Sequence, residues 1–336
     1  MRGSEGPFFV NRVQPTTLGL IVKCLTAILC VALLLLSCNS GVAPDRANSD
    51  WSSLIIDNRP DDAHIDLSGQ IFVVANSRNS YPTSAKTCKD GTDPVNPYPV
   101  AVIDINRPRV SNLVVAGRVP QDSGWQASYC NSAALRFEDA DGPHVENVRM
   151  QKVWDGIRFG KGTTEFSLSN IRISGARDDC IENDYLAGGL ITNVLLEDCF
   201  SGISMYATDP SQRPATGSVL VLQDTLIKLR AGQYKENDWH AMPIKTNGNA
   251  PKLVIRSSVF AVDHMPMIGG RNAEVMWGLI ESCSDNLLLI FNRTDNEREL
   301  HGLPDCFTVI SGAKARDEWA VQRNKWIDRN PEIRDR

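Results

Sequence analysis

The chain has 336 residues, of which 42% are hydrophobic and 22% are charged, with a formal net charge of −5. Removing the first 38 residues takes away three basic residues and one acidic residue, which leaves 32 basic against 39 acidic residues and a net charge of −7. A surface of this sign does not suit phosphate binding, so the balance argues against a nucleic-acid partner. The length after that segment allows one elongated domain or two compact ones.

The N-terminal segment is predicted to be a secretory signal. Lys23 precedes a run of fourteen mostly apolar residues, 24–37, which leads directly into Cys38. Such a run has the plan of a signal h-region and is too short to cross a bilayer comfortably. Its last residues, LLSC at 35–38, resemble the lipobox of bacterial lipoproteins, in which the cysteine is lipidated. The resemblance implies a lipoprotein signal peptide over residues 1–37 and lipidation at Cys38. It also implies a lipid-anchored location in the bacterial cell envelope, facing the periplasm or the cell surface. A plain signal peptide and an uncleaved anchor are the alternatives.

The cysteine count supports export. Two of the nine cysteines lie in the apolar run and one is the expected lipidation site, which leaves Cys88, Cys130, Cys180, Cys199, Cys283 and Cys306. An even number in an exported chain allows up to three disulfides, and the residues alone leave their pairing open. No cysteine or histidine spacing typical of zinc is present, so we expect no structural metal site of that type.

A repeat dominates the rest of the chain. Residues 38–65 are polar and are expected to form a tether and an N-terminal cap, whereas residues 66–312 contain short β-type runs between turns. HVENVRM, SLSNIRI and LITNVLL place an asparagine before an apolar-x-apolar run at Asn147, Asn170 and Asn193, 23 residues apart each time. A fixed period indicates a solenoid. We expect the three asparagines to form a stacked amide ladder.

A second short strand follows in each repeat. It is present in GIRF (156–159), CIEN (180–183) and GISM (202–205), and later in PIKT (243–246) and PMIG (266–269). Two or more short strands in each repeat favour a parallel β-helix, in which alternate residues fill a continuous core. The leucine-rich repeat is the rival solenoid. It is less suitable here because the apolar positions of this chain are a mixture of Ile, Val, Met and Phe. In addition, no helical segment follows each strand.

The C-terminal residues 313–336 are predicted to be helical, with Trp319 and Trp326 on one face. We expect them to form a short helical cap over the open end of the solenoid, which would otherwise expose unpaired strand edges. The predicted fold class is therefore all-β, a parallel β-helix solenoid with a short C-terminal helical cap. We expect it to be a monomer.

The stretch DDCIEND, residues 178–184, carries four acids. Aligning the second strands places Asp155 and Asp179 at the same point of neighbouring coils, about 4.8 Å apart by ordinary strand spacing, with Asp178 beside them. Three carboxylates this close cannot all ionise freely, so one is expected to hold its proton near neutrality, as an acid/base pair requires. Turn capping through backbone N–H groups is the alternative role for Asp155 and Asp179.

The same alignment puts Arg158, Glu182, Ser204 and Lys245 in one outward column. Glu182 is expected to pair with Arg158 one coil away. Lys245 is either a substrate contact or a solvated side chain.

Four short motifs add a resemblance. WDGI, RDDCI, DCFSGIS and MPIKT occur in the order and at about the spacing of four motifs of the polygalacturonases. These pectin-cleaving glycoside hydrolases are built on a right-handed parallel β-helix, and the resemblance, over about residues 145–250, implies that fold here. It implies that Asp155, Asp178 and Asp179 act as general acid and as activators of the attacking water, without a metal. It also implies a disulfide between Cys180 and Cys199 and a grip of Lys245 on a sugar carboxylate.

The chain also departs from these motifs. Val153 and Trp154 stand in place of the family's Asn and Thr, Ser201 in place of its catalytic His, and Pro243 in place of its Arg. Two of the groups that orient the substrate and tune the acids in that family are therefore absent here.

Two longer insertions, 206–217 and 231–242, are expected to flank the column that contains Ser204 and Lys245. Their aromatic residues offer flat faces to a sugar ring or else hold the loops in place, and His240 either substitutes for the missing His or is an ordinary surface residue. The substrate-binding residues predicted on these grounds are Lys245, Glu182, Ser204, Tyr206, Trp239 and His240.

Together these features predict an envelope lipoprotein whose β-helix hydrolyses a glycosidic bond in a polysaccharide with paired aspartates and no cofactor. A non-catalytic glycan-binding or structural β-helix is the alternative. A lyase that uses Ca²⁺, held by Asp178 and Asp184, is a further alternative, with Arg177, directly before the acid stretch, as the only basic residue beside these acids.

Overall fold

The computed structural model describes residues 54–73, 99–119, 121, 133–207, 209, 211–234, 237–264, 273–292 and 300–333. All of them belong to one compact unit, Val42–Arg336. The predicted signal peptide and Cys38 lie outside the described residues, as do Cys88 and Cys130. Strands are the main secondary structure and helices are few, which confirms the all-β class.

Two large sheets make up the fold, and every strand pairing within them is parallel. The smaller sheet has seven strands, in the spatial order β1 (Leu54–Ile56), β4 (Val100–Ile103), β7 (Ala133–Glu138), β9 (Asp155–Phe159), β11 (Asp179–Glu182), β13 (Ser201–Met205) and β17 (Ile244–Thr246). Strand β1 falls within residues 38–65, the segment expected to form the tether and cap, so paired strands begin there at Leu54.

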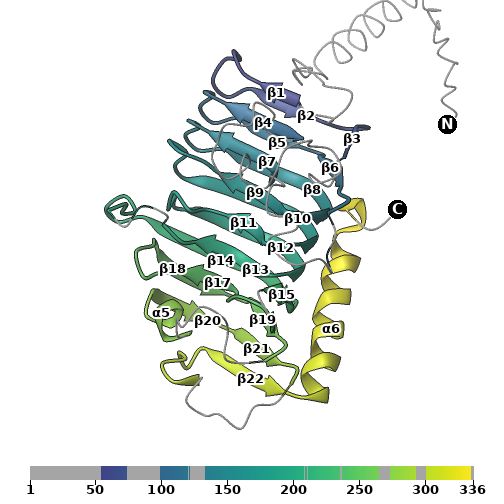
Figure 1. The fold of residues 1–336 in the computed structure, drawn as a ribbon, viewed down its shortest axis with the longest axis vertical. Coiled ribbons are helices and arrows are strands. Elements are labelled where there is room, and N and C mark those ends of the chain that lie inside the picture. The colour runs from purple at the N-terminus through teal and green to yellow at the C-terminus, as the bar shows by residue number, and fades with distance from the viewer. Residues whose placement is uncertain are drawn as a thin grey trace, which may run out of the picture. The chain divides into compact units, whose positions relative to one another are not determined.

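The larger sheet has 13 strands. In chain order they are β2 (His64–Asp66), β3 (Ile71–Phe72), β5 (Arg109–Ser111), β6 (Val114–Ala116), β8 (His144–Val153), β10 (Phe166–Ala176), β12 (Gly189–Cys199), β14 (Val219–Leu229), β18 (Lys252–Arg256), β19 (Val259–Val262), β20 (Ile280–Ser284), β21 (Asn286–Ile290) and β22 (Phe307–Ser311). As Figure 1 shows, the chain passes repeatedly from one sheet to the other, so that each coil adds a strand beside the previous one.

Outside the two sheets, the described residues form the antiparallel hairpin of β15 (Gly232–Tyr234) and β16 (Asn237–Trp239), the helices α5 (Ala273–Trp277) and α6 (Ala313–Arg329), and the 3₁₀ turn η2 (Pro331–Ile333).

The core lies between the two sheets and is built from stacked apolar columns. In the smaller sheet Ile157, Ile181, Ile203 and Ile244 are direct register partners on four consecutive strands, and none of them is exposed. Burying each such side chain contributes about 1.5–3 kcal/mol. The register of these four strands confirms the alignment of the second strands from which the outward column of Arg158, Glu182, Ser204 and Lys245 was predicted.

A left-handed backbone position recurs at the same point of each coil in the larger sheet. Asn147, Asn170 and Asn193 have φ values of 56°, 51° and 52°. The amide of Asn170 donates to Asn147 and the amide of Asn193 donates to Asn170, which confirms the predicted ladder. Asparagine suits this position because it tolerates a positive φ and its amide both donates and accepts. Each coil therefore bends here while adjacent coils stay bonded.

The C-terminal helix confirms the predicted secondary structure but not the predicted position. Helix α6 lies alongside the strands of the larger sheet (Figure 1). Its Trp319, Trp326 and Ile327 pack against outward-facing side chains of that sheet, among them Leu195 and Leu226. The helix therefore covers the outer face of the sheet rather than the open end of the stack, because these strands carry apolar residues on both faces.

Polar contacts fasten the same helix. Glu197 in β12 is buried and accepts hydrogen bonds from Arg172 in β10 and from Arg323 in α6. Asn330, which follows the helix, exchanges amide hydrogen bonds with Asn193. The amide ladder thus continues from the coils into the C-terminal segment.

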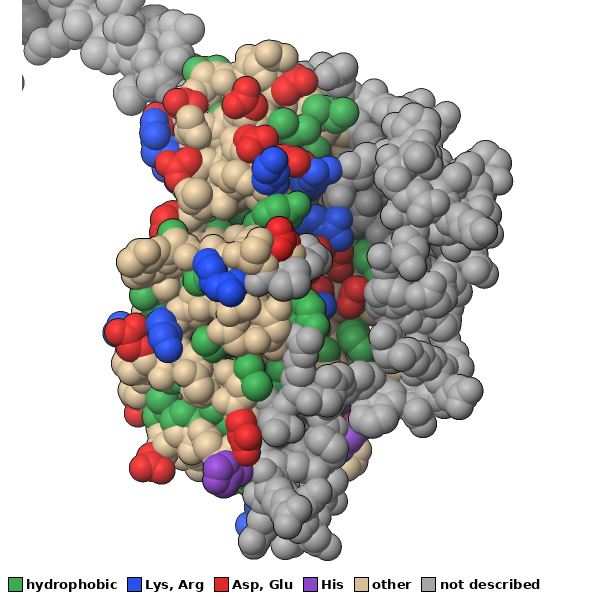
Figure 2. Space-filling model, turned by 60° about the vertical axis from the view of Figure 1, so that its left-hand side comes forward, with side chains coloured by type: hydrophobic (Ala, Val, Ile, Leu, Met, Phe, Trp, Pro, Cys, Tyr) green, Lys and Arg blue, Asp and Glu red, His purple; other side chains and the backbone are tan. Residues whose placement is uncertain are grey.

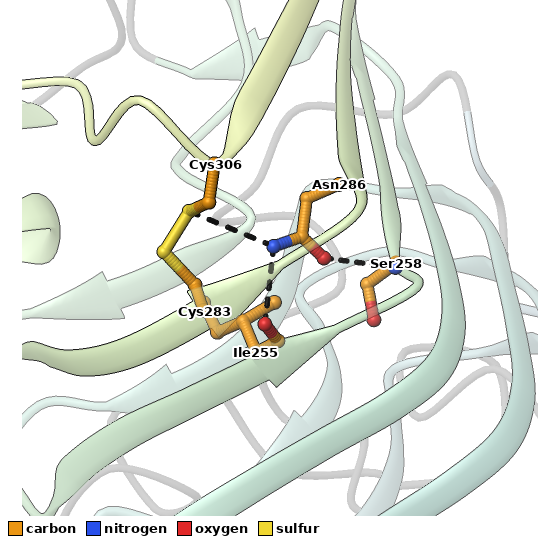
Figure 3. The surroundings of a disulfide bond; sticks show 5 residues. All are labelled: Ile255, Ser258, Cys283, Asn286 and Cys306. Carbon is orange, nitrogen blue, oxygen red and sulfur yellow. Dashed lines mark hydrogen bonds between the residues drawn. A yellow bond between two sulfur atoms is a disulfide. The ribbon is translucent and has the colours of Figure 1, made fainter.

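Two disulfides join neighbouring coils. Cys180 pairs with Cys199, with 5.7 Å between Cα atoms, as the resemblance implied, and Cys283 pairs with Cys306. Beside the second bridge the buried Asn286 amide donates to the carbonyl of Ile255 and lies 3.8 Å from the Cys306 sulfur, while its oxygen accepts from the Ser258 N–H (Figure 3). Disulfides of this kind indicate an oxidising, exported compartment.

No helix among the residues described above combines the length and apolarity that crossing a bilayer requires. On the face drawn in Figure 2, acidic and basic side chains are interspersed.

Candidate active site

Three aspartates meet where two strands of the smaller sheet begin. Asp155 is the first residue of β9, Asp179 is the first residue of β11, and Asp178 precedes it. The pairing of Ile157 with Ile181 places Asp155 and Asp179 at equivalent points of adjacent coils. One carboxylate oxygen from each of the three aspartates lies within 4.8 Å of the others, so the predicted convergence is present.

Asp155 is almost fully enclosed. Its side chain is 1% exposed, one carboxylate oxygen accepts the backbone N–H of Asp179 at 3.0 Å, and the other accepts from the Arg158 guanidinium at 2.6 Å. The first of these contacts ties one coil to the next. Asp155 thus performs the turn-capping role considered from the sequence and also belongs to the acid cluster.

Asp179 is held by the lysine that the motif comparison singled out. Its Oδ2 accepts from Lys245 Nζ at 2.7 Å, and the residue is 3% exposed. Its register neighbour on β13 is Ser201, which is also buried. Lys245 therefore neutralises an acid of the cluster in this structure.

Glu182 forms the predicted ion pair with Arg158. Because Arg158 also binds Asp155, one guanidinium serves two carboxylates. Burial raises the pKa of Glu182, but the charges of Arg158 and Lys245 and the hydrogen bonds with Asp155 and Arg158 together outweigh it and lower the net pKa. Burial, together with the charge of Glu182, raises the pKa of Asp155 well above its usual range despite Arg158. Asp155 therefore holds a proton more strongly than Glu182 does.

The charge of Lys245 affects the pKa of Asp179, the other buried aspartate of the cluster. Burial raises the pKa of Asp179, and the charge of Lys245 opposes that rise without cancelling it. Burial lowers the pKa of Lys245, but the charges of Asp179, Asp178 and Asp184 outweigh it and raise the net pKa. Lys245 is therefore a permanent cation among these acids.

Asp184 is a member of the site that sequence reasoning considered only as a calcium ligand. Its Oδ1 accepts the Ser204 hydroxyl and the backbone N–H of Tyr206. Burial, only partly opposed by Lys245, raises its pKa to about 6. Nothing in the local sequence pattern predicts this contact, because it joins the turn after β11 to the end of β13.

Several predicted substrate contacts are not accessible. Ser204 and His240 are fully buried. The His240 ring contacts the carbonyl of Ala241 and accepts the backbone N–H of His264, and burial lowers its pKa. Neither side chain is positioned to touch a substrate in this conformation.

The aromatic contacts are only partly described. Tyr206 is partly exposed beside Asp184, at the start of the first insertion. Trp239 belongs to β16, and its side chain lies outside what the structure describes. Lys245 and Glu182 are partly exposed and remain in the outward column that the register predicts.

The acid cluster does not suit calcium. This ion takes six to eight oxygen ligands, yet both oxygens of Asp155 and one oxygen of Asp179 already accept from protein donors. Lys245 also places a positive charge 2.7 Å from an Asp179 oxygen. Three oxygens of the cluster are therefore already engaged by protein donors. Of the two calcium ligands named for the lyase alternative, Asp178 and Asp184, the latter also accepts two hydrogen bonds through its Oδ1.

Comparison of the chain with known protein families, with curated proteins and with solved structures found no match.

Within the cluster, Asp178 differs from its two neighbours in accessibility. It is partly exposed, whereas Asp155 and Asp179 are buried. A molecule that approaches from solvent therefore meets Asp178 first, with the other two carboxyls behind it.

Proposed function

We propose that the chain is a right-handed parallel β-helix lipoprotein of the bacterial cell envelope that hydrolyses glycosidic bonds of a polysaccharide. The observation that supports the activity best is the convergence of Asp155, Asp178 and Asp179, whose carboxylate oxygens lie within 4.8 Å of one another. Glycoside hydrolysis needs a protonated and an ionised carboxyl near one bond. Close like charges together with burial produce that difference in protonation.

Each aspartate then has a distinct role. Asp178 is the partly exposed member and contacts the glycosidic oxygen or the attacking water. Asp155 keeps a proton behind it, because burial and neighbouring charges raise its pKa. Asp179 is ion-paired to Lys245 and is the first residue of β11, so it holds the start of that strand beside Asp155 and Asp178. Asp178 and Asp155 are thus the ionised and the protonated carboxyl that the reaction needs, and Asp179 is a positioning residue beside them.

The lipid anchor on Cys38 would hold this domain at a membrane. The two disulfides favour such an exported location, because they form and persist in oxidising compartments. The N-terminal signal itself is supported by the sequence pattern described above.

A non-catalytic role is favoured by one specific observation. Asp155 and Asp179 are only 1% and 3% exposed, and one carboxylate oxygen of Asp155 accepts a hydrogen bond from the backbone N–H of Asp179. Buried acids with such contacts hold coils together whether or not a reaction takes place. A glycan-binding or structural envelope β-helix is therefore the second candidate function.

Reducing-end release by the purified protein separates the two functions. The protein is incubated with acidic and neutral polysaccharides, with and without EDTA, while absorbance at about 235 nm is followed, where the unsaturated ends left by a β-eliminating lyase absorb. The hydrolase proposal expects release that EDTA does not affect and no gain in absorbance. Release accompanied by absorbance and abolished by EDTA would move the assignment to a lyase.

The variant Asp178→Asn tests the role of the exposed acid. It should abolish release while leaving the unfolding transition unchanged, since Asp178 is partly exposed. Asp317→Asn, which removes an exposed carboxylate from α6, is the matched control and should retain full activity. Absence of release from every glycan, or full activity in Asp178→Asn, would favour the non-catalytic candidate.

A further inference from the structure

The two cations beside the acid cluster are both bound to carboxylates of the protein itself. Lys245 Nζ lies 2.7 Å from an Asp179 oxygen. The Arg158 guanidinium lies 2.6 Å from an Asp155 oxygen and also forms an ion pair with Glu182. The two basic side chains are 26% and 25% exposed, so a ligand can approach them from solvent. It then meets two positive charges that the protein has already balanced.

Two further arginines lie close to these groups. Arg136 is the register neighbour of Arg158 on β7 and forms an ion pair with Glu138 of its own strand. Arg177, which directly precedes the cluster, is 2% exposed, and its guanidinium lies beside Gly232 at the start of β15. Of these two arginines, one is therefore balanced within its own strand and the other is closed to solvent.

The carboxyls of this part of the molecule outnumber its cations. Burial and, to a smaller extent, the charges of Glu182 and Asp179 raise the pKa of Asp184 against the charge of Lys245, so these groups interact. Five carboxyls share the two cations of the site, namely Asp155, Asp178, Asp179, Glu182 and Asp184 with Arg158 and Lys245. Even with Asp155 protonated, four carboxyls remain for two cations, which leaves an excess of negative charge when they ionise.

A uronic sugar would bring another carboxylate into this surrounding. Binding a carboxylate tightly requires a basic side chain or several N–H donors directed at it. Lys245 could supply that contact only by leaving Asp179, which is 3% exposed, and a buried carboxylate that loses its partner is strongly destabilising. Arg158 already holds two carboxylates. The incoming group would also meet charges of its own sign, which repel it.

Resting on the hydrolase function proposed above, we propose that the polysaccharide bound at this cluster carries no carboxylate on the sugars next to the cleaved bond. The substrate class is therefore a non-uronic polysaccharide. Lys245 then stays on Asp179 instead of gripping a sugar carboxylate, which is the contact that the motif resemblance implied. The same ion pairs that hold the coils in place thus select against acidic glycans.

The test compares polymers that differ in a carboxylate alone. Polygalacturonate and polymannuronate are each assayed beside their carboxyl-reduced forms, and galactan, mannan and glucan beside their C6-oxidised forms. We expect reducing-end release from the uncharged member of any cleaved pair to be at least about tenfold faster at low ionic strength, because like charges placed close together are costly. Added salt should narrow this difference by speeding release from the acidic member.

The variant Asp184→Asn tests the electrostatic origin of the preference. The asparagine oxygen can still accept from the Ser204 hydroxyl and the Tyr206 N–H, so the variant removes one negative charge and keeps the contacts. We expect it to raise the ratio of acidic to neutral release about threefold or more. Asp305→Asn removes an exposed carboxylate outside the site and should leave the ratio unchanged.

The outcomes separate this inference from the activity on which it rests. Equal release from both members of a pair, or faster release from the acidic member, would overturn the inference and leave the hydrolase function standing. A preference that neither salt nor Asp184→Asn reduces would also overturn it, because shape rather than charge would then be selected. Absence of release from every polymer would refute the hydrolase function and this inference together.

Discussion

Replacing Asp184 by Asn should make the protein more stable at neutral pH and leave it unchanged in acid. The Asp184 carboxyl has a pKa of about 6 in the folded protein against an ordinary value of 3.8. A folded state that binds a proton more tightly than the unfolded state loses stability as pH rises through these two values. One pKa unit corresponds to about 1.4 kcal/mol, so ionising Asp184 costs the fold about 3 kcal/mol above pH 6.

The asparagine amide reproduces the neutral form of this carboxyl. Its oxygen can still accept from the Ser204 hydroxyl and the Tyr206 N–H, which are the contacts of Asp184. We therefore expect equal free energies of unfolding for the two proteins near pH 4. By pH 7 the variant should be more stable by about 3 kcal/mol, the difference worked out above.

The assay is urea unfolding at a series of pH values between 4 and 7, with the free energy of unfolding extrapolated to water at each pH. Asp305→Asn, which removes an exposed carboxylate outside the site, serves as control and should follow the parent protein. Parallel profiles for Asp184→Asn and the parent protein across this range would refute the reasoning, because they would show that Asp184 ionises without cost.

Two further perturbations probe the scaffold by urea unfolding. Asn170→Ala removes both ladder bonds of a residue with a φ of 51°, and should cost about 2–3 kcal/mol from two hydrogen bonds and left-handed strain. Asn170→Gly should cost about 1 kcal/mol less because it relieves the strain. An unchanged midpoint in both variants would contradict the role of the ladder. Replacing Cys283 and Cys306 together by Ser opens a bridge with a sequence separation of 23, and should cost about 3 kcal/mol. Equal stability of this double variant and the parent protein would show that the bridge does not constrain the unfolded chain.

The repeat could be predicted from the sequence because each unit contains the same short local pattern at a fixed spacing. Asparagines spaced 23 residues apart determine both the period and the ladder. The register of the second strands follows from their short apolar motifs, and it brings Asp155 next to Asp179. The ion pair between Glu182 and Arg158 follows from the same register.

The position of α6 could not be predicted in the same way. Trp319 and Trp326 indicated that one face of the helix is buried, but not which surface covers it. A signal was present in β12, β14 and β19, where Leu195, Leu226 and Val259 point outward although solvent would favour polar residues there. Apolar residues on the outer face of a coil indicate a covering element.

The burial of individual site residues could not be predicted from the sequence either. Register places Ser204 in the outward column, yet its side chain is buried, because it bonds to Asp184 from the neighbouring coil. His240 follows the β15–β16 hairpin and packs against His264, which lies more than 20 residues further along the chain. Contacts of this kind depend on loop conformation, which local patterns do not encode.

Helix α6 limits the number of strands that the larger sheet can hold beneath it. The helix packs across five consecutive strands of the larger sheet, β22, β21, β19, β14 and β12, and its two ends are held at the last coil and at Asn193. Repeat proteins ordinarily gain or lose units without disturbing the others, since each unit contacts only its neighbours. Here one extra coil would shift Glu197 and Asn193 by about 4.8 Å relative to the helix. The length of the helix is therefore matched to the number of coils that it spans. Any relative with another number of coils in this region must carry a helix of correspondingly different length.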